Sequence, residues 1–383
     1  MPDAQQSKDG ESVPAIMAES RRSGNPLLRS RAGLIGSGVL LLLVAICVGS
    51  LPWTLSSAGQ DAQGRALPAR YKHGDLDGYL IPPFWAPMDK KEVERLRTVA
   101  LHRATDRFAQ ESGFSEAGPP TPSEAQVQTA TPRYLMGTDK LGRSLFVRCL
   151  TGGGVSIGIG IAAATISVLI GTLYGTISGY AGGRTDAVMM RIVDILYGLP
   201  YLLLVVLLAV AGDSLIDRYA LATKDAGGEL SGGTRSLLEV LILLAAIGGL
   251  SWLTMARVIR GQVLSLKAQP FMEAARAMGL PLSRQFLRHL LPNLLGPIIV
   301  YATLTVPQAI LQESFLSFLG IGVRPPLPSW GNLASDGLVE LNTVKIRWWL
   351  IVFPSLLLGV TLLALNFVGE GLREAFDPKR SRS

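Results

Sequence analysis

Six apolar stretches constrain the fold of this chain more than any other feature of its sequence. Each is roughly twenty residues long and almost free of charged side chains, which is the length that a helix needs to cross a lipid bilayer. A charge at the bilayer centre costs about 2.5 to 3.5 kcal/mol, so the pattern predicts an all-α integral membrane protein with six transmembrane helices. The stretches are 33–53, 155–180, 194–212, 238–256, 293–316 and 348–369.

Composition supports a membrane location and narrows the function classes. Of 383 residues, 48% are hydrophobic and only 17% are charged, and the mean hydropathy of +0.34 is high for a soluble protein. The net charge of +7 does not indicate nucleic-acid binding, because the basic residues are scattered between apolar runs. Cys47 and Cys149 lie in or beside apolar runs, and no clustered Cys or His residues offer a metal site.

The distribution of lysine and arginine predicts the orientation in the membrane. Basic residues are concentrated in both termini and in the second-to-third and fourth-to-fifth connections, and they are fewer in the opposite short connections. The positive-inside rule therefore places both termini in the cytoplasm. The predicted divisions are a cytoplasmic tail at 1–32, a first transmembrane helix at 33–53, an external segment at 54–150, a core of five transmembrane helices at 151–371 and a cytoplasmic tail at 372–383.

The long external segment has an organisation of its own. Apolar residues at helical spacing predict a soluble helix over 88–112. Four prolines between 119 and 132 predict an extended linker after it. Residues 138–150 mix charged and apolar side chains, which suits a helix that lies in the membrane interface before the second span.

The connection before the fifth span is the most informative part of the chain. Residues 269–293 read QPFMEAARAMGLPLSRQFLRHLLPN. The pattern predicts a short helix with one apolar stripe, which suits docking into a groove on a partner. The stripe contains Phe271, Ala274, Ala275 and Met278.

Three breaker residues predict how this connection turns. Gly279 can end the first short helix in the left-handed conformation, and Pro281 can begin a second one. Pro292 can then begin the fifth span. The prediction is a helix, a turn and a helix on the cytoplasmic face.

The order of Glu273-Ala274-Ala275, Gly279 and Leu291-Pro292 resembles the EAA loop of ABC-importer permeases. Further motifs resemble the second permease of dipeptide, oligopeptide and nickel importers. They are GTDKLGR at 137–143, GYAGGRTDAVMMRIVDILYGLP at 179–200, ESFLSFLGIGVRPPLPSWG at 313–331 and NFVGEGLREAFDP at 366–378. The resemblance covers about residues 30 to 378 without most of 54–132, a segment longer than is usual in the family.

The resemblance implies a type I ABC importer permease in the bacterial plasma membrane, with an enlarged external loop between helices 1 and 2. It implies a transport subunit that is not an enzyme and holds no cofactor, with ATP and Mg bound by two partner ATPase subunits. A second homologous permease and an extracytoplasmic solute-binding protein would complete the assembly. The cargo would be di- or oligopeptides, with nickel or another small solute as the alternative.

The same resemblance assigns an ATPase-coupling role to the loop at 257–292. The residues implied are Phe271, Glu273, Ala274, Ala275, Met278, Gly279 and Pro292. Movement of this loop as a rigid element would switch the pathway between the two faces of the membrane.

Four other residues are candidate functional or structural positions. Arg191 and Asp194 are three residues apart and are predicted to form an ion pair on one helix face. Glu313 either lines a pathway or caps a helix packed against Arg324. Trp330 follows a proline-rich stretch and lies either near an external gate or in the membrane interface as an anchor.

Two rival functions leave weaker traces in the sequence. An ion-coupled secondary transporter is expected to show acidic residues or interrupted helices at corresponding positions of two halves, and neither is clear. A membrane sensor would need an output domain, which the short C-terminal tail does not supply. A phosphate-binding GxxxxGK[ST] motif is lacking from the sequence, so ATP hydrolysis is expected on other chains.

Overall fold

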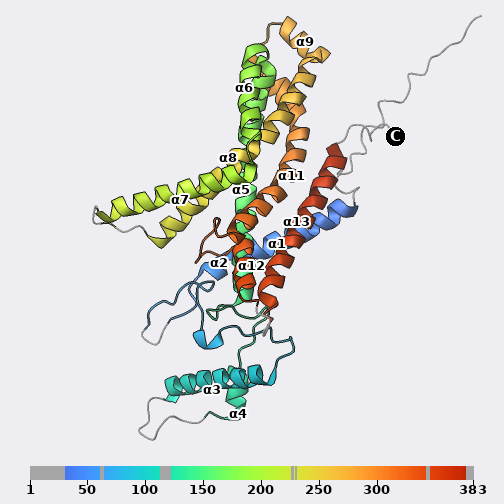
Figure 1. The fold of residues 1–383 in the computed structure, drawn as a ribbon. Coiled ribbons are helices and arrows are strands. Elements are labelled where there is room, and N and C mark those ends of the chain that lie inside the picture. The colour runs from blue at the N-terminus through green and yellow to red at the C-terminus, as the bar shows by residue number, and fades with distance from the viewer. Residues whose placement is uncertain are drawn as a thin grey trace, which may run out of the picture.

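The computed structural model describes residues 31–60, 64–112, 122–225, 228, 231–341 and 346–376. Most of the two predicted cytoplasmic tails, and Pro119 and Pro120 of the predicted linker, lie outside the described residues. The described residues form helices joined by loops with isolated β-bridges, and they contain no extended strand. The predicted all-α class is therefore confirmed. Long helices connect one end of the molecule, where α9 lies, to the opposite end, where α3 and α4 lie (Figure 1).

The first half of the chain supplies the elements α1 (Arg31–Gly49), α2 (Leu51–Leu55), η4 (Leu76–Gly78), α3 (Lys90–Ser112), α4 (Glu124–Ala130), α5 (Leu145–Ala181) and α6 (Gly183–Tyr197). The second half supplies α7 (Tyr201–Asp225), α8 (Gly232–Lys267), α9 (Pro270–Ala277), α10 (Leu282–Gln285), η5 (Phe286–Leu290), α11 (Leu291–Phe318), α12 (Trp330–Val339) and α13 (Trp349–Phe376).

Five continuous helical runs are long and apolar enough to cross a membrane, and a sixth crossing requires the bent pair of α6 and α7. The predicted third span at 194–212 is therefore wrong as one straight helix, because the chain bends by 86° between Tyr197 and Tyr201. Gly198 caps α6, and Pro200 has no N–H to continue a helix and disfavours a helical conformation at Leu199. The bend thus follows from the Gly-Leu-Pro sequence.

The glycine-rich second span is the packed interior helix that its small residues predict. α5 and α8 approach so closely that a Cβ atom at Gly175 would lie 2.4 Å from the carbonyl oxygen of Ala256. At Gly171 a Cβ atom would lie 2.5 Å from the Cβ of Met255. Small residues permit such backbone contact in lipid, where packing replaces the hydrophobic effect between helices.

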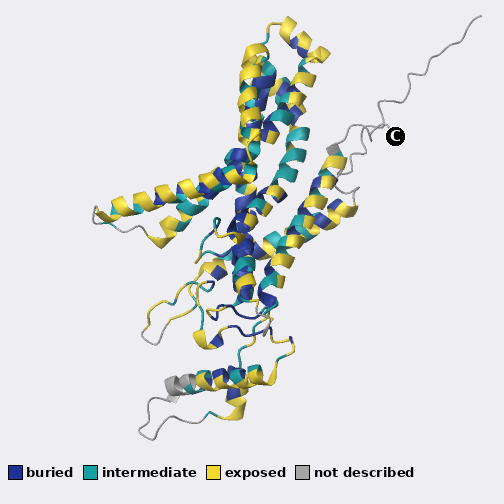
Figure 2. Cartoon of the chain, in the orientation of Figure 1, coloured by how far each residue is buried: buried dark blue, intermediate teal, exposed yellow. Residues whose placement is uncertain are grey.

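Exposed residues lie along the outward faces of the other long helices (Figure 2), and many of them are large hydrophobic residues. On α7, for example, Leu203 and Leu207 are 63% and 60% exposed, and on α1 Leu41 is 68% exposed. Exposed leucines of this density suit lipid or a neighbouring membrane helix rather than water. Burial is concentrated on α5, which is dark blue over much of its length (Figure 2).

The segment between the first two spans contains a small helical unit of its own. α3 confirms that a helix forms over nearly all of the predicted range 88–112. The predicted linker differs, because its residues 124–130 form α4, which begins with a capping box at Ser123. α3 and α4 pack through a core of alanines and one valine, which comprises Ala100, Ala104, Val127 and Ala130.

The predicted interfacial helix over 138–150 is wrong in its first half, which forms a tight turn. The Asp139 carboxylate accepts hydrogen bonds of 2.9 Å from the backbone N–H groups of Leu141 and Arg143. Gly142 has a φ of +69°, and a Cβ atom there would lie 1.7 Å from the Asp75 carbonyl oxygen. Helix α5 therefore begins only at Leu145, after this turn.

Candidate functional site

The 269–293 connection forms a short helix, a turn and a second helical run, as its breaker residues predict. Pro270 occupies the first turn of α9, where its missing N–H costs nothing. Gly279 has a φ of +69°, and the N–H of Leu280 donates to the Ala275 carbonyl at 3.2 Å. This helix ending requires a left-handed residue, which is why glycine fits the position.

The two faces of α9 correct the predicted single apolar stripe. Phe271, Ala274 and Met278 are exposed, whereas Ala275 is buried. Ala275 lies one turn beyond Met272, which is also buried, so these two residues form the inward face. The outward face therefore consists of three of the four predicted residues. Glu273 is exposed.

Met272 attaches α9 to the rest of the molecule, and sequence reasoning did not single it out. Its side chain is fully buried in a cluster contributed by the second half of α8, by η5 and by the start of α11. The other buried members are Met255, Ile259, Val263, Leu290 and Leu294. The signal available in the sequence was the three-residue spacing of Met272 and Ala275.

Gln285 fixes the turn to α5, and it too was missed from the sequence. The Tyr180 hydroxyl donates a hydrogen bond of 2.6 Å to its Oε1. Its Nε2 donates a hydrogen bond of 2.6 Å to the Leu280 carbonyl. Lys267 adds a second link, because its Nζ donates to the Tyr180 carbonyl at 2.6 Å. The connection is therefore hydrogen-bonded to the end of α5 on both sides of α9.

Pro292 lies in the first turn of α11, as predicted for the start of the fifth span. The preceding residues are also helical, however, so α10, η5 and α11 form one run from Leu282 to Phe318. The middle of this run, residues 286–290, is π-helical. Single π-helical turns within α-helices are frequently found at functional sites.

Asp194 forms its ion pair with a different partner from the one predicted. Its Oδ1 lies 2.8 Å from Nη2 of Arg257 on α8, so the predicted pair with Arg191 is wrong. Tyr197 follows on the same face of α6, and the Arg257 guanidinium lies 4.0 Å from its ring centroid. The arginine is thus held by a charge and an aromatic face together.

A second pair joins α6 to α8 nearer α9. Arg260 binds Asp186 in a bidentate manner, with Nε and Nη2 at 2.6 and 2.5 Å from the two carboxylate oxygens. Ser178 on α5 donates to the same carboxylate. A bidentate arginine–carboxylate pair fixes the orientation of both side chains, which adds geometric specificity to its energy. These contacts therefore hold α5, α6 and α8 in one arrangement.

A cavity of about 440 Å³ opens where the corner between α6 and α7 meets α8 and α11. Its lining includes Tyr201, Ser251 and Gln312, which form one hydrogen-bonded group. The Tyr201 hydroxyl donates to Gln312 Oε1 at 2.7 Å and lies 3.0 Å from the Ser251 hydroxyl. Sequence analysis singled out none of the three, although glutamines within an apolar span were a visible signal.

Glu313 is completely buried and is not among the residues that line this cavity. Its carboxylate accepts hydrogen bonds from Ser317 at 2.7 Å and from Ser314 at 3.2 Å. Arg324 pairs instead with Asp213 on α7, at 2.5 Å. The predicted helix cap packed against Arg324 is therefore wrong, because Arg324 pairs with Asp213 and Glu313 is held by the serines of its own helix. The alternative that Glu313 lines a pathway stays a prediction.

Trp330 is also completely buried, which excludes the exposed interface anchor considered from the sequence. Its indole Nε1 donates to the Cys149 carbonyl at 3.1 Å, and its backbone N–H donates to the Ser156 hydroxyl at 3.3 Å. A Cβ atom at Gly153 would lie 2.6 Å from its ring. Trp330 therefore holds the start of α12 against α5.

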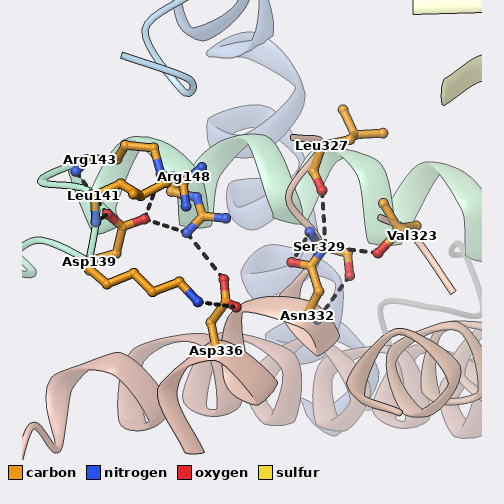
Figure 3. Close-up of polar contacts among 10 residues, drawn as sticks. Asp139, Leu141, Arg143, Arg148, Val323, Leu327, Ser329, Asn332 and Asp336 are labelled. Carbon is orange, nitrogen blue, oxygen red and sulfur yellow. Dashed lines mark hydrogen bonds and ion pairs between the residues drawn. The ribbon is translucent and has the colours of Figure 1, made fainter. Parts of the chain in front are cut away.

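A charged network joins the same two helices near the start of α5 (Figure 3). The Asp139 Oδ2 lies 2.7 Å from Arg143 Nε and 2.6 Å from Arg148 Nη1. Asp336 on α12 lies 3.6 Å from Arg148 and 3.8 Å from Lys140. Arg148 is 1% exposed in its side chain, so Asp139 is the principal compensation for a buried charge.

The chain is similar to membrane components of bacterial transport systems. Residues 171–382 match a family model described as the binding-protein-dependent transport system inner membrane component. The chain is 45% identical over 246 residues to the oligopeptide transport system permease protein OppC of Haemophilus influenzae, covering 64% of this chain and 70% of that protein. It is 43% identical over 250 residues to the dipeptide transport system permease protein DppC of Bacillus subtilis, covering 65% and 70%.

One relative extends the similarity through the segment between the first two spans. A candidate peptide permease protein of Brucella suis is 31% identical over 373 residues, which cover 97% of this chain and 95% of the relative. Among solved structures, this chain is similar to a chain of the MetNI methionine ABC transporter, with 17% identity and a TM-score of 0.41. The match covers 59% of this chain and 94% of that chain.

Proposed function

Because this chain belongs to the family of inner membrane components of binding-protein-dependent transport systems, we propose that it forms half of a transmembrane pathway for di- or oligopeptides. It is a permease subunit of an ABC transporter and not itself an enzyme. The peptide cargo is supported by relatives whose names specify oligopeptide and dipeptide transport. The family also removes the secondary transporter and the sensor from consideration.

The proposed assembly contains a second homologous permease, two ATPase subunits and an extracytoplasmic binding protein. ATP and Mg bind to the ATPase subunits in this proposal. The chain lies in the bacterial inner membrane with both termini in the cytoplasm, which the excess of basic residues near α9 and at both termini supports. The α9 end is then cytoplasmic, and the α3–α4 unit faces the opposite side.

The observation that carries the coupling role is the division of α9 into an exposed face and an anchored face. Phe271, Ala274 and Met278 offer a small apolar surface outward, which suits a groove on an ATPase subunit. Met272 and Gln285 tie the same loop to α5, α8 and α11. Displacement of α9 by the ATPases would therefore move these three helices together.

Cysteine crosslinking tests where the ATPase docks. The native thiols of Cys47 and Cys149 are 2% and 1% exposed, so introduced cysteines report with little background. Ala274→Cys and Met278→Cys should each crosslink to a co-expressed ATPase subunit, whereas Leu203→Cys on the exposed face of α7 should not. Failure of both α9 variants in an assembled complex would contradict docking at this face.

Uptake into proteoliposomes tests the cargo. The complete complex should accumulate a labelled oligopeptide only when ATP and the cognate binding protein are both present. Nickel uptake under the same conditions, without peptide uptake, would replace the peptide assignment with the metal alternative.

A further inference from the structure

The cavity between α7, α8 and α11 carries a polar stripe that the transport assignment alone does not explain. Four residues of α11 recur at helical spacing of four, three and four: Tyr301, Thr305, Gln308 and Gln312. All four line the cavity. Residues at this spacing share one helix face, so α11 presents hydroxyl and amide groups to the cavity over about three turns.

The amide groups of this stripe have unused hydrogen-bonding capacity. Gln312 accepts from Tyr201 through Oε1, while its Nε2 has no partner among the described residues. Gln308 is exposed, and its side chain has no hydrogen-bond partner in the described part of the chain. An unpaired amide facing hydrocarbon costs several kcal/mol. Gln308 is therefore expected to face water, a polar ligand or a polar group of the second permease rather than lipid.

The lining also lacks fixed charge. Among the described residues that form the cavity there is no Asp, Glu, Lys, Arg or His. A neutral lining neither attracts substrates of one charge strongly nor repels substrates of the opposite charge. Rings of charged side chains, in contrast, make a pathway selective for the sign of the substrate's charge. Primary amides supply one acceptor and two donors, which is the complement of the C=O and N–H groups of a peptide bond.

We propose that Gln308 and Gln312, together with Tyr201 and Ser251, form half of a binding site for the backbone of an extended peptide. The site pairs with the carbonyl and N–H groups of the cargo and does not discriminate by the charge of its side chains. This proposal rests on the proposed peptide-import function and specifies which residues contact the cargo.

Thiol labelling tests whether the stripe is accessible to cargo. In the assembled complex, Gln308→Cys should react with a membrane-impermeant charged thiol reagent. The reaction should slow when peptide-loaded binding protein and ATP are supplied. Leu203→Cys, which is 63% exposed on α7, should stay unlabelled because lipid covers it. Absence of labelling at Gln308→Cys in every state would overturn the proposal, because the residue would then be covered by the second permease.

Uptake measurements test the pairing with peptide bonds. Gln308→Leu and Gln312→Leu should each lower peptide uptake roughly two- to tenfold, the effect of one neutral hydrogen bond. ATP hydrolysis stimulated by loaded binding protein should persist, and Gln60→Leu, at an exposed position between the first two spans, should leave uptake unchanged. Peptides methylated at backbone nitrogen should be transported poorly by the wild-type complex, with a smaller penalty in Gln308→Leu.

The outcomes separate this proposal from the one on which it rests. If the wild-type complex imports no peptide, the transport assignment fails. If it imports peptide and both leucine variants import it equally well, the assignment stands and the backbone site is overturned. Acidic and basic peptides that the binding protein captures with equal affinity should be imported at similar rates. A strong preference for one charge would also contradict the neutral site.

Discussion

The Tyr180 hydroxyl donates a hydrogen bond of 2.6 Å to Oε1 of Gln285, which lies 105 residues away in the sequence. Nε2 of Gln285 in turn donates a hydrogen bond to the Leu280 carbonyl. One amide thus joins the end of α5 to the turn that follows α9. Replacing Gln285 with Leu leaves a hydroxyl and a carbonyl without their partner, at a cost of about 1 to 3 kcal/mol. We expect Gln285→Leu to assemble but to uncouple ATP hydrolysis from uptake, measured as peptide accumulated per ATP hydrolysed. Normal coupling in this variant would show that the link is dispensable.

Gly279 allows a sharper test of the α9 turn, because its surroundings are open. A Cβ atom there meets nothing within 4 Å, so any defect comes from the φ of +69°. Gly279→Val should reach the membrane and lose most ATP-dependent uptake, since a β-branched residue strongly disfavours this conformation. Gly38→Val is the matched control, because Gly38 is equally open and lies inside helix α1. Equal uptake by both variants would contradict a role for the turn.

The close contact of α5 and α8 predicts opposite effects for two glycines of α5. Gly175→Ala should destabilise the permease by about 1 to 3 kcal/mol, because the new methyl group meets the Ala256 carbonyl oxygen at 2.4 Å. Gly158→Ala meets nothing within 4 Å and should be neutral or slightly stabilising, since alanine favours helix. Thermal unfolding in detergent measures both. A tolerated Gly175→Ala would show that the helices can separate without loss.

The network in Figure 3 predicts unequal roles for its two acids. Asp139→Asn removes the main compensation for the buried Arg148 guanidinium, which should cost about 3 kcal/mol or more. Asp336 is 33% exposed and lies farther from Arg148, at 3.6 Å, so Asp336→Asn should cost less than about 1 kcal/mol. Melting temperatures of the two variants check the order. A reversed order would indicate that α12 depends on Asp336 instead.

Features set by neighbouring residues could be predicted from the sequence. The turn at Gly279 needs only a helix ending and a residue that tolerates positive φ, and both are local. The apolar runs, the soluble helix α3 and the packed face of α5 likewise follow from composition and spacing. The break before Tyr201 was also readable in principle, because Gly198 and Pro200 interrupt a helix whatever surrounds them.

Features set by distant partners could not be predicted in this way. Asp194 had a nearby arginine in sequence, yet it pairs with Arg257, which α8 brings to it from 63 residues away. The inward side of α9 depends on where Met272 meets α8 and α11. Glu313 was predicted to line a pathway or cap a helix, and Trp330 to lie near a gate or in the membrane interface. Only the folded chain shows that both are completely buried.

The length of α5 has a mechanical consequence. Its 37 residues extend about 55 Å, well beyond a hydrocarbon core of about 30 Å. Arg148 lies near one end of this rod and Tyr180 near the other, so the network of Figure 3 and the hydrogen bonds beside α9 belong to a single stiff body. A tilt of only about 5° at one end displaces the other by about 5 Å. Small angular changes on one side of the membrane thereby become motions of side-chain size on the other.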